Sequence, residues 1–235
     1  MGSVNLVDGK MRASLALKTC QRQDYLLHWS PDKRMPMARA QTPTAYHHGD
    51  LPAALRRAGW ELLGESGLRG LTLRECARRA GVSHAAPAHH FGSLEGLLTE
   101  LAADGYERML DCIVATQRES ADPLLGGGLG YIRFALAFPQ QFRMMLGLDV
   151  RARTLPRLVQ ASGAAMACLR ETLRAQWIAR HGSAPARELL EQRTLLAWSA
   201  VHGYASLAID RKHEALSAMP PEVLFAPLLK GLLEP

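Results

Sequence analysis

The stretch TLRECARRAGVSHAAPAHHF, residues 72–91, decides the fold of this chain. Its pattern is typical of two short helices separated by a glycine turn. Thr72 is a good N-cap for a helix over residues 73–80, and Gly81 allows the positive φ that a tight turn requires. Ser83 is expected to cap a second helix that ends near residue 91. The stretch therefore predicts a helix-turn-helix, whose second helix enters the major groove of DNA.

The side chains of this stretch divide into an apolar and a polar face. The apolar face is expected to contain Leu73, Cys76, Ala77, Val82, Ala86 and Phe91. The residues left outside are Arg74, Arg78, Arg79, His84 and His89. Pro87 falls in the first turn of the second helix or just past it, where its missing N–H costs least. This basic outer face favours DNA binding over a generic helical hairpin.

Helical periodicity continues on both sides of the motif. From Asp50 onward, apolar residues recur every three or four positions until two glycines stop the pattern at Gly67 and Gly70. Helices are also predicted over residues 95–118, 122–138, 140–146, 155–180, 185–209 and 221–233. Because no stretch alternates like a strand, the predicted fold class is all-α. It consists of an N-terminal three-helix helix-turn-helix domain and a C-terminal helical bundle, about nine helices in all.

Composition limits the functional classes. The net charge of +6 arises mainly in residues 1–44, so charge alone is a weak argument for DNA binding. The four cysteines lie far apart, which fits a reduced cytoplasmic protein better than a disulfide framework. No apolar run is long enough to span a membrane. The motifs HExxH, GxSxG and ExxH are absent, so an enzyme is not expected.

Two further patterns could suggest a phosphate-binding loop and a metal site, but the sequence supports neither. Gly126 to Gly130 form a glycine-rich run, but neither a preceding strand nor a following Lys-Ser/Thr pair supports a phosphate-binding loop. The histidines of the N-terminal half lack a cysteine or carboxylate that would complete a regular metal site. We therefore expect no metal and no cofactor.

The segment from Tyr46 to about Tyr106 resembles the TetR family of transcription regulators. Caps, glycines and apolar positions match together in GLRGLTLRECARRAGVSHAAPAHHFGSLEGLL. The lead-in YHHGDLPAALRRAG and the phrase GVSHAAP resemble one subgroup, which often carries a C-terminal Trp-His-Gly (WHG) type domain. The sequence WSAVHG supplies Trp198, His202 and Gly203 at the corresponding place.

The resemblance implies a one-component, ligand-responsive regulator that acts as a homodimer on a near-palindromic operator, with repression favoured over activation. Its expected partners are double-stranded DNA and a small-molecule effector, with no membrane. Three parts are expected: residues 1–44 as a disordered or mis-annotated extension, 45–94 as the DNA-binding domain and 95–235 as the effector-binding and dimerisation domain. Met35 and Met37 are alternative starts for the chain.

Three residues depart from the family pattern. Ala88 stands where the family usually has an aromatic residue, His89 where it has a basic one, and Leu94 where a lysine commonly opens the fourth helix. Each change removes an expected phosphate contact, and such contacts supply most non-specific affinity. A helical interaction protein that has lost strong DNA binding is therefore the alternative.

The DNA-contacting residues follow from this layout. The candidates for the major groove are Ser83, His84, Ala85 and His89. The candidates for phosphate are Tyr46, His47, Thr72 and Arg74, although residues 46–48 are also compatible with a flexible linker.

An apolar or amphipathic effector is expected among the C-terminal helices. Trp198 and His202 lie one helical turn apart and share a face, as pocket residues or equally as a core pair. Phe134 and Phe138 are further pocket candidates, although the core is the commoner place for such residues. The last two long helices are expected to pair with their copies in a dimer through Leu189, Leu196, Leu224, Leu228 and Leu232.

Overall fold

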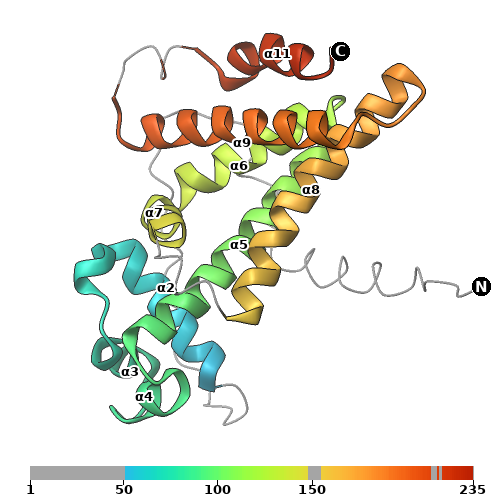
Figure 1. Ribbon diagram of the computed structural model, residues 1–235. Coiled ribbons are helices and arrows are strands. Elements are labelled where there is room, and N and C mark those ends of the chain that lie inside the picture. Colours follow the sequence, from blue (N-terminus) through green and yellow to red (C-terminus); the bar gives the residue numbers. More distant parts are fainter. Residues whose placement is uncertain (1–50, 148–154, 213–215, 217–218, 235) are drawn as a thin grey trace, which may run out of the picture. The chain divides into compact units, whose positions relative to one another are not determined.

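The computed structural model describes residues 51–147, 155–212, 216 and 219–234, which belong to one compact unit, Tyr46–Pro235. The expected extension over residues 1–44, together with Tyr46 and His47, lies outside the described residues. Within them the chain forms nine α-helices and no strand, as the all-α prediction required (Figure 1). No helix among these residues is long and apolar enough to cross a membrane.

The helices follow the predicted order. They are α2 (Leu51–Gly70), α3 (Leu73–Ala80), α4 (Ala86–Phe91), α5 (Leu94–Glu119), α6 (Pro123–Ala137), α7 (Pro139–Gly147), α8 (Pro156–His181), α9 (Arg187–Ile209) and α11 (Pro221–Leu232). Most boundaries agree with the sequence prediction within one or two residues. The exception is α4, which begins at Ala86, two residues later than a cap at Ser83 would place it.

Local signals fix the small N-terminal helices. In α2, Gly67 has a φ of 63°, and the helix kinks there. The hydroxyl of Thr72 accepts a hydrogen bond from the Glu75 N–H at 3.1 Å and begins α3. Gly81 adopts a φ of 69° after α3, and the Val82 N–H donates to the Ala77 carbonyl at 3.0 Å. This is the left-handed glycine termination of a helix.

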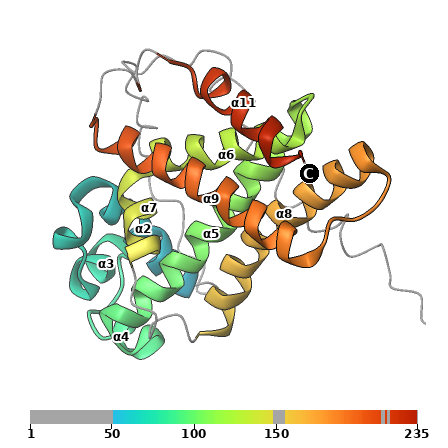
Figure 2. The same ribbon diagram turned by 45° about the horizontal axis from the view of Figure 1, so that its top comes forward.

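Helix α5 connects the head formed by α2, α3 and α4 to the remaining helices. Its 26 residues give a length of about 39 Å. It packs against α2 and α4 at one end, and against α6, α7 and α8 along the rest of its length. Figures 1 and 2 show α9 crossing α6, with α11 beyond it. Helices α5 to α9 and α11 form the body of the described chain. Each of the others is positioned against α5 directly or through α6.

Helices α5 and α6 approach each other closely because two glycines of the run face α5. A Cβ atom at Gly126 would lie 2.6 Å from the Thr116 carbonyl oxygen, and one at Gly130 would lie 2.6 Å from the Cys112 carbonyl oxygen. Both distances are far below van der Waals contact. The glycine-rich run is thus a helix-packing device, which agrees with rejecting it as a phosphate loop.

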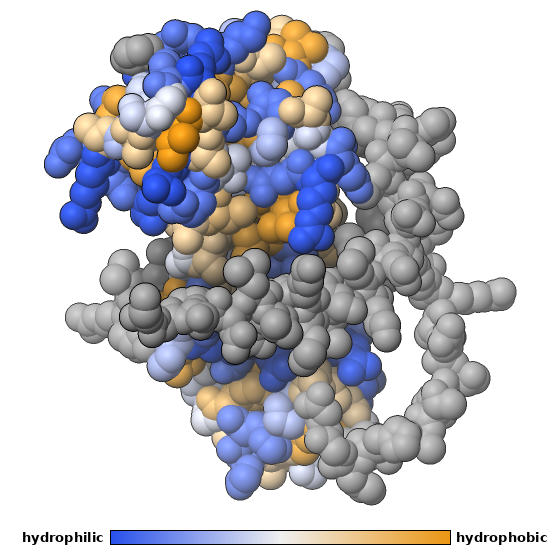
Figure 3. All heavy atoms as spheres, turned by 90° about the vertical axis from the view of Figure 1, so that its right-hand side faces the viewer, coloured by the Kyte–Doolittle hydropathy of each residue, from blue (hydrophilic) through white to orange (hydrophobic). Residues whose placement is uncertain are grey.

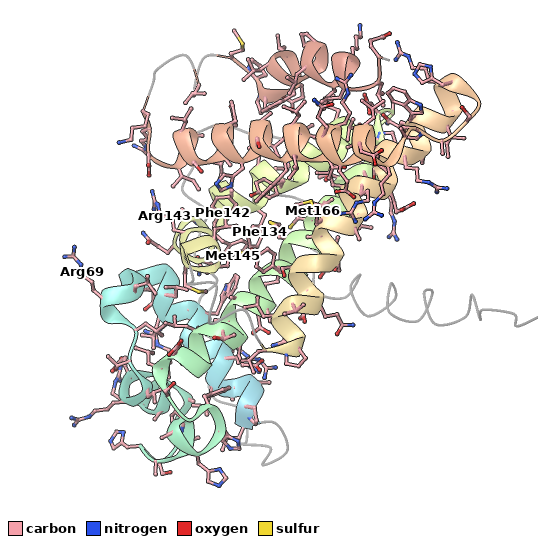
Figure 4. All side chains as sticks on the ribbon, in the orientation of Figure 1. Arg69, Phe134, Phe142, Arg143, Met145 and Met166 are labelled. Carbon is pink, nitrogen blue, oxygen red and sulfur yellow. The ribbon has the colours of Figure 1, made fainter. Side chains whose placement is uncertain are left out.

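The core lies where α6 and α7 meet α5. Phe134, Phe142 and Met145 are almost fully buried and point into the interior of the body, whereas Arg143 points outward (Figure 4). Arg143 forms an ion pair with Asp210. The face shown in Figure 3 is mixed, with apolar side chains lying between hydrophilic ones.

We predict that Gly130→Ala lowers the free energy of unfolding by about 1–3 kcal/mol, because the added methyl group forces α5 and α6 apart. Gly163→Ala in α8 is the matched control, since a Cβ there meets nothing within 4 Å. The control should gain up to about 1 kcal/mol from helix propensity. Urea unfolding compares the two, and equal stability of both variants would contradict the close packing.

Candidate functional site

The predicted recognition surface lies on the head and is open to solvent. Ser83, His84, Ala85 and His89 are all exposed, and so are Thr72 and Arg74 at the preceding helix. In the described part of the chain, Arg74 forms no ion pair, so its guanidinium is available to a phosphate. Thr72 uses one lone pair in its cap and keeps its O–H for donation.

The predicted N-cap at Ser83 is wrong. Helix α4 begins at Ala86 with Ala85 as its N-cap, and no side chain caps it. The cause is Pro87. A helix capped at residue 83 would make its first hydrogen bond from the N–H of residue 87, which proline lacks. Instead, the Ala86 N–H donates to the Ser83 carbonyl at 3.0 Å in a turn, and the first bond of α4 runs from His89 to Ala85 at 3.0 Å. The Ser83 hydroxyl is therefore not used as a cap.

The basic residues of α3 are unequally available. Arg79 forms a two-pronged contact with Glu65 of α2 at 2.6 and 2.7 Å, which ties α3 to α2. This hydrogen bond holds the pKa of Glu65 below its usual value. Arg78 pairs with Glu75 one turn away on an exposed surface. Such a pair is weak in water, so phosphate competes with it more readily than with the Arg79 pair.

Residues Phe134 and Phe138 connect the head to the body rather than forming a cavity. The Trp60 ring of α2 packs edge-on against Phe138 at 5.6 Å between centroids, and Phe138 contacts Phe134 at 5.4 Å. The Gln141 side chain of α7 donates to the Trp60 carbonyl at 3.0 Å in a buried position. The head is thus attached to the end of α6 by apolar packing and to α7 by a buried hydrogen bond.

An ion network joins the head to α8. Arg157, near the start of α8, contacts Glu100 at 2.6 Å and Glu107 at 2.8 Å, and also pairs with Asp104, all on α5. Asp104 lies 3.3 Å from Arg56 of α2 as well. One carboxylate therefore holds a cation from the head and a cation from the body.

A cavity of about 170 Å³ lies among six helices of the body. Its lining is mostly apolar and comes from α5, α6, α8 and α9, with one residue each from α7 and α11. The lining includes Ile113 and Gln117 of α5, Gly127, Gly128 and Tyr131 of α6, Ser162, Ala165 and Met166 of α8, and Trp198 and Val201 of α9. Met166 extends from α8 toward the interior in Figure 4.

Trp198 lines this cavity, whereas His202, Phe134 and Phe138 do not. His202 lies behind Tyr131, whose hydroxyl is 3.0 Å from the His202 Nδ1. Trp198 forms a side-chain hydrogen bond with Tyr131, and burial raises the pKa of Tyr131. Burial also lowers the pKa of His202. Because the indole can only donate, the Trp198 N–H donates to the Tyr131 oxygen.

Sequence reasoning found Trp198 but missed Tyr131 and Gln117. No local signal separates these two from core residues, because they meet at the cavity only when α5, α6 and α9 pack together. The glycine run is visible in the sequence, but only the packing of the helices determines that Gly127 and Gly128 face the cavity.

Two family models match the described region. The model of bacterial regulatory proteins of the tetR family matches residues 55–101, which contain the helix-turn-helix. A tetracyclin repressor-like C-terminal domain model matches residues 124–232, which contain most of the cavity lining.

The chain belongs to the TetR family. It is a DNA-binding transcriptional regulator with an N-terminal helix-turn-helix and a helical C-terminal domain. The finer subgroup, marked by Trp198, His202 and Gly203, stays a prediction, as do the residue boundaries of the domains.

Solved structures agree with the TetR-family fold. A protein of unknown function from Rhodococcus sp. RHA1 is 27% identical, with a TM-score of 0.66 over 81% of this chain and 97% of that one. SCO4313, a protein assigned a regulatory role, is 26% identical, with a TM-score of 0.61 over 79% and 96%. The TetR family transcriptional regulator PfmR from Thermus thermophilus shares the fold at 19% identity, with a TM-score of 0.51 over 76% and 96%. No curated protein matches the chain.

We predict that Thr72→Ala lowers the free energy of unfolding by about 1 kcal/mol through loss of the cap. Ser83→Ala should change it by less than about 0.5 kcal/mol, because that hydroxyl caps no helix. Urea unfolding of the two single variants makes the comparison. A larger loss for Ser83→Ala than for Thr72→Ala would restore Ser83 as the cap.

Proposed function

We propose that this regulator is a ligand-responsive repressor that binds a near-palindromic operator as a homodimer. The observation that carries the proposal is the presence, in one chain, of a solvent-open recognition surface and an apolar cavity of about 170 Å³ in the attached body. Helices α2, α5 and α7 link the two. A ligand in the cavity would control whether two heads match the spacing of their half-sites.

We assign some residues of the recognition surface to base edges and others to phosphate groups. His84 and Ala85 precede α4 and are exposed, where they can reach base edges. An alanine methyl packs on a thymine methyl, and a histidine N–H donates to a guanine acceptor. Arg74 and Thr72 belong to the preceding helix and are assigned to phosphate. His89 and Ser83 are further candidates for the groove, and Tyr46 and His47 remain candidates for phosphate.

The decisive experiment is a titration of His84→Ala and Arg74→Ala on selected and scrambled duplexes at two salt concentrations. His84→Ala should cost about 1–3 kcal/mol on the selected operator and relax the preference at one base pair. Arg74→Ala should weaken binding to all sequences alike and reduce the salt slope by about one. An equal loss for His84→Ala on every duplex would exclude base readout by His84.

The alternative is a helical interaction protein that has lost strong DNA binding. It draws on Ala88, His89 and Leu94, which replace the aromatic and basic residues expected from the family pattern. The same titration decides between the two: wild-type protein without preference for selected over scrambled DNA would favour the alternative.

An apolar face on α9 and α11 supports the homodimer. Leu196, Leu224 and Leu228 are 48%, 42% and 41% exposed in the single chain. On α9, Ser199 and Gly203 follow Leu196 at helical spacing, and a Cβ at Gly203 would meet nothing within 4 Å. A face of apolar and small residues suits close packing against the same face of a second copy. Leu232 does not belong to it, because it is buried within its own chain. Leu189 lies about two turns before Leu196 on the same side of α9 and is half-buried in the single chain.

We expect light scattering at micromolar concentration to give about twice the chain mass of 25.7 kDa. Leu196→Glu should raise the dimer dissociation constant by about 30-fold or more, as for a central apolar contact. Leu68→Glu is the control, since Leu68 is an equally exposed leucine on the head. A monomeric wild type, or equal weakening by both variants, would contradict this interface.

The ligand response has a physical route through α7. Tyr131 of the cavity wall packs edge-on against Phe142 of α7 at 5.5 Å, and Phe142 stacks on His202 at 5.7 Å. The neighbouring Gln141 holds the Trp60 carbonyl of α2. A ligand that moves Tyr131 would shift α7 and, through it, α2. It does so only to the extent that it binds two arrangements unequally, typically about 1–3 kcal/mol of coupling.

A further inference from the structure

The cavity owes part of its space to the middle of the glycine run in α6. Gly127 and Gly128 line it, between the two glycines that face α5. A Cβ at Gly128 would meet a single heavy atom within 4 Å, the Val201 Cγ1 at 3.2 Å, apart from its chain neighbours and its own helix backbone. A side chain at this position would therefore extend along the cavity wall. The run thus serves two purposes, helix packing and an open wall.

In the part of the chain that the structure describes, the cavity has no group that would compensate a charged ligand. None of the described residues that line it is an acid, a lysine, an arginine or a histidine. His202 does not line the cavity and instead contacts Tyr131 and Trp198, which do. Moving an ionised group from water into such surroundings is strongly unfavourable unless it is paired. The lining therefore selects against anions and cations.

The volume sets the size of the ligand. An apolar cavity of ~150 Å³ stays dry and accepts benzene. The cavity here is of similar size, about 170 Å³. It accommodates one six-membered ring with one or two further heavy atoms, in the arrangement that the structure describes.

The Gln117 side chain has a hydrogen-bond donor left for the ligand. The Thr172 hydroxyl donates to the Cys168 carbonyl at 2.8 Å, so its oxygen accepts from the Gln117 Nε2 at 3.0 Å. The Cys168 thiol faces the Gln117 Oε1 at 3.6 Å. These partners fix the orientation of the amide. Since Nε2 carries two hydrogens, the second is left for an acceptor atom of a bound molecule.

We propose that the ligand is an uncharged, single-ring apolar compound with one hydrogen-bond acceptor that contacts Gln117. The absence of a side chain at Gly128 leaves the space that the ring occupies. This proposal rests on the ligand response proposed above and names the chemical class that would trigger it.

The test is calorimetric titration of the full-length protein with p-cresol, which is neutral and has the proposed size. Benzoate and benzylammonium serve as the anionic and cationic counterparts of nearly the same size. We expect saturable binding of one p-cresol per chain and at least ~10-fold weaker binding of both ions. Absence of saturable p-cresol binding, or equally tight binding of either ion, would overturn the proposal.

The variant Gly128→Leu tests the position of the site. Its side chain should fill the cavity and weaken p-cresol binding at least ~10-fold, while helix propensity and cavity filling keep the protein folded. Gly163→Leu is the matched control on the exposed side of α8, where a Cβ meets nothing. If Gly128→Leu does not fold, Ala165→Leu fills the cavity from α8 instead. Unchanged binding in the cavity-filling variant would overturn the proposal.

An operator titration with and without p-cresol separates this proposal from the regulatory one. Saturable binding that leaves operator affinity unchanged would support the ligand class and contradict the ligand response. Selective operator binding by a protein that binds no p-cresol would contradict the ligand class and leave the DNA-binding role intact.

Discussion

The close approach of α5 and α6 is the constraint on which the rest of the structure depends. Gly126 and Gly130 leave no Cβ between the two backbones, and the buried Thr116 hydroxyl bonds to the carbonyls of Cys112 and Ile113 within α5. Helix α5 then carries the head at one end, and α6 carries α9 and α11 on its other side. Because the packing glycines flank Gly127 and Gly128, the contact that joins the helices also places the bare segment of α6 at the cavity.

Head and body are joined by contacts of different kinds. The buried bond from Gln141 to the Trp60 carbonyl is directional and would be costly to leave unmade. The network of Arg157 with three carboxylates of α5 is partly exposed, so salt screens it. Sliding the head relative to α7 would break the hydrogen bond from Gln141 to the Trp60 carbonyl. By contrast, α8 can shift while Arg157 changes its carboxylate partner on α5. This difference favours α7 as the element through which a change in the cavity reaches α2.

Sequence predicted the elements well where the signal is local. Thr72 acts through a side-chain bond to a backbone N–H three residues away, and Gly81 acts through its own φ, so their roles can be deduced from a few neighbouring residues. The error at Ser83 was also local, because Pro87 removes the N–H that a cap at that position needs, and the sequence already contained it. The cavity is different. Gln117, Tyr131 and Met166 come from three helices, and periodicity marks each only as inward-facing. The same ambiguity explains why Phe134 and Phe138, selected as aromatic residues near the pocket, proved to join α2 to α6.

The distribution of charge on the head bears on how it would read DNA. Arg79 is committed to Glu65 and holds α3 against α2, while the turn and helix that would face the groove offer histidine, serine and alanine rather than lysine or arginine. The turn and α4 therefore add no fixed cation of their own, and counterion release depends on neighbouring residues such as Arg74. In the proposed homodimer, selectivity would come from base edges and from the spacing of two heads. Spacing would then carry more of the discrimination than it does in a strongly basic head, and the proposed ligand, by changing that spacing, would control binding effectively.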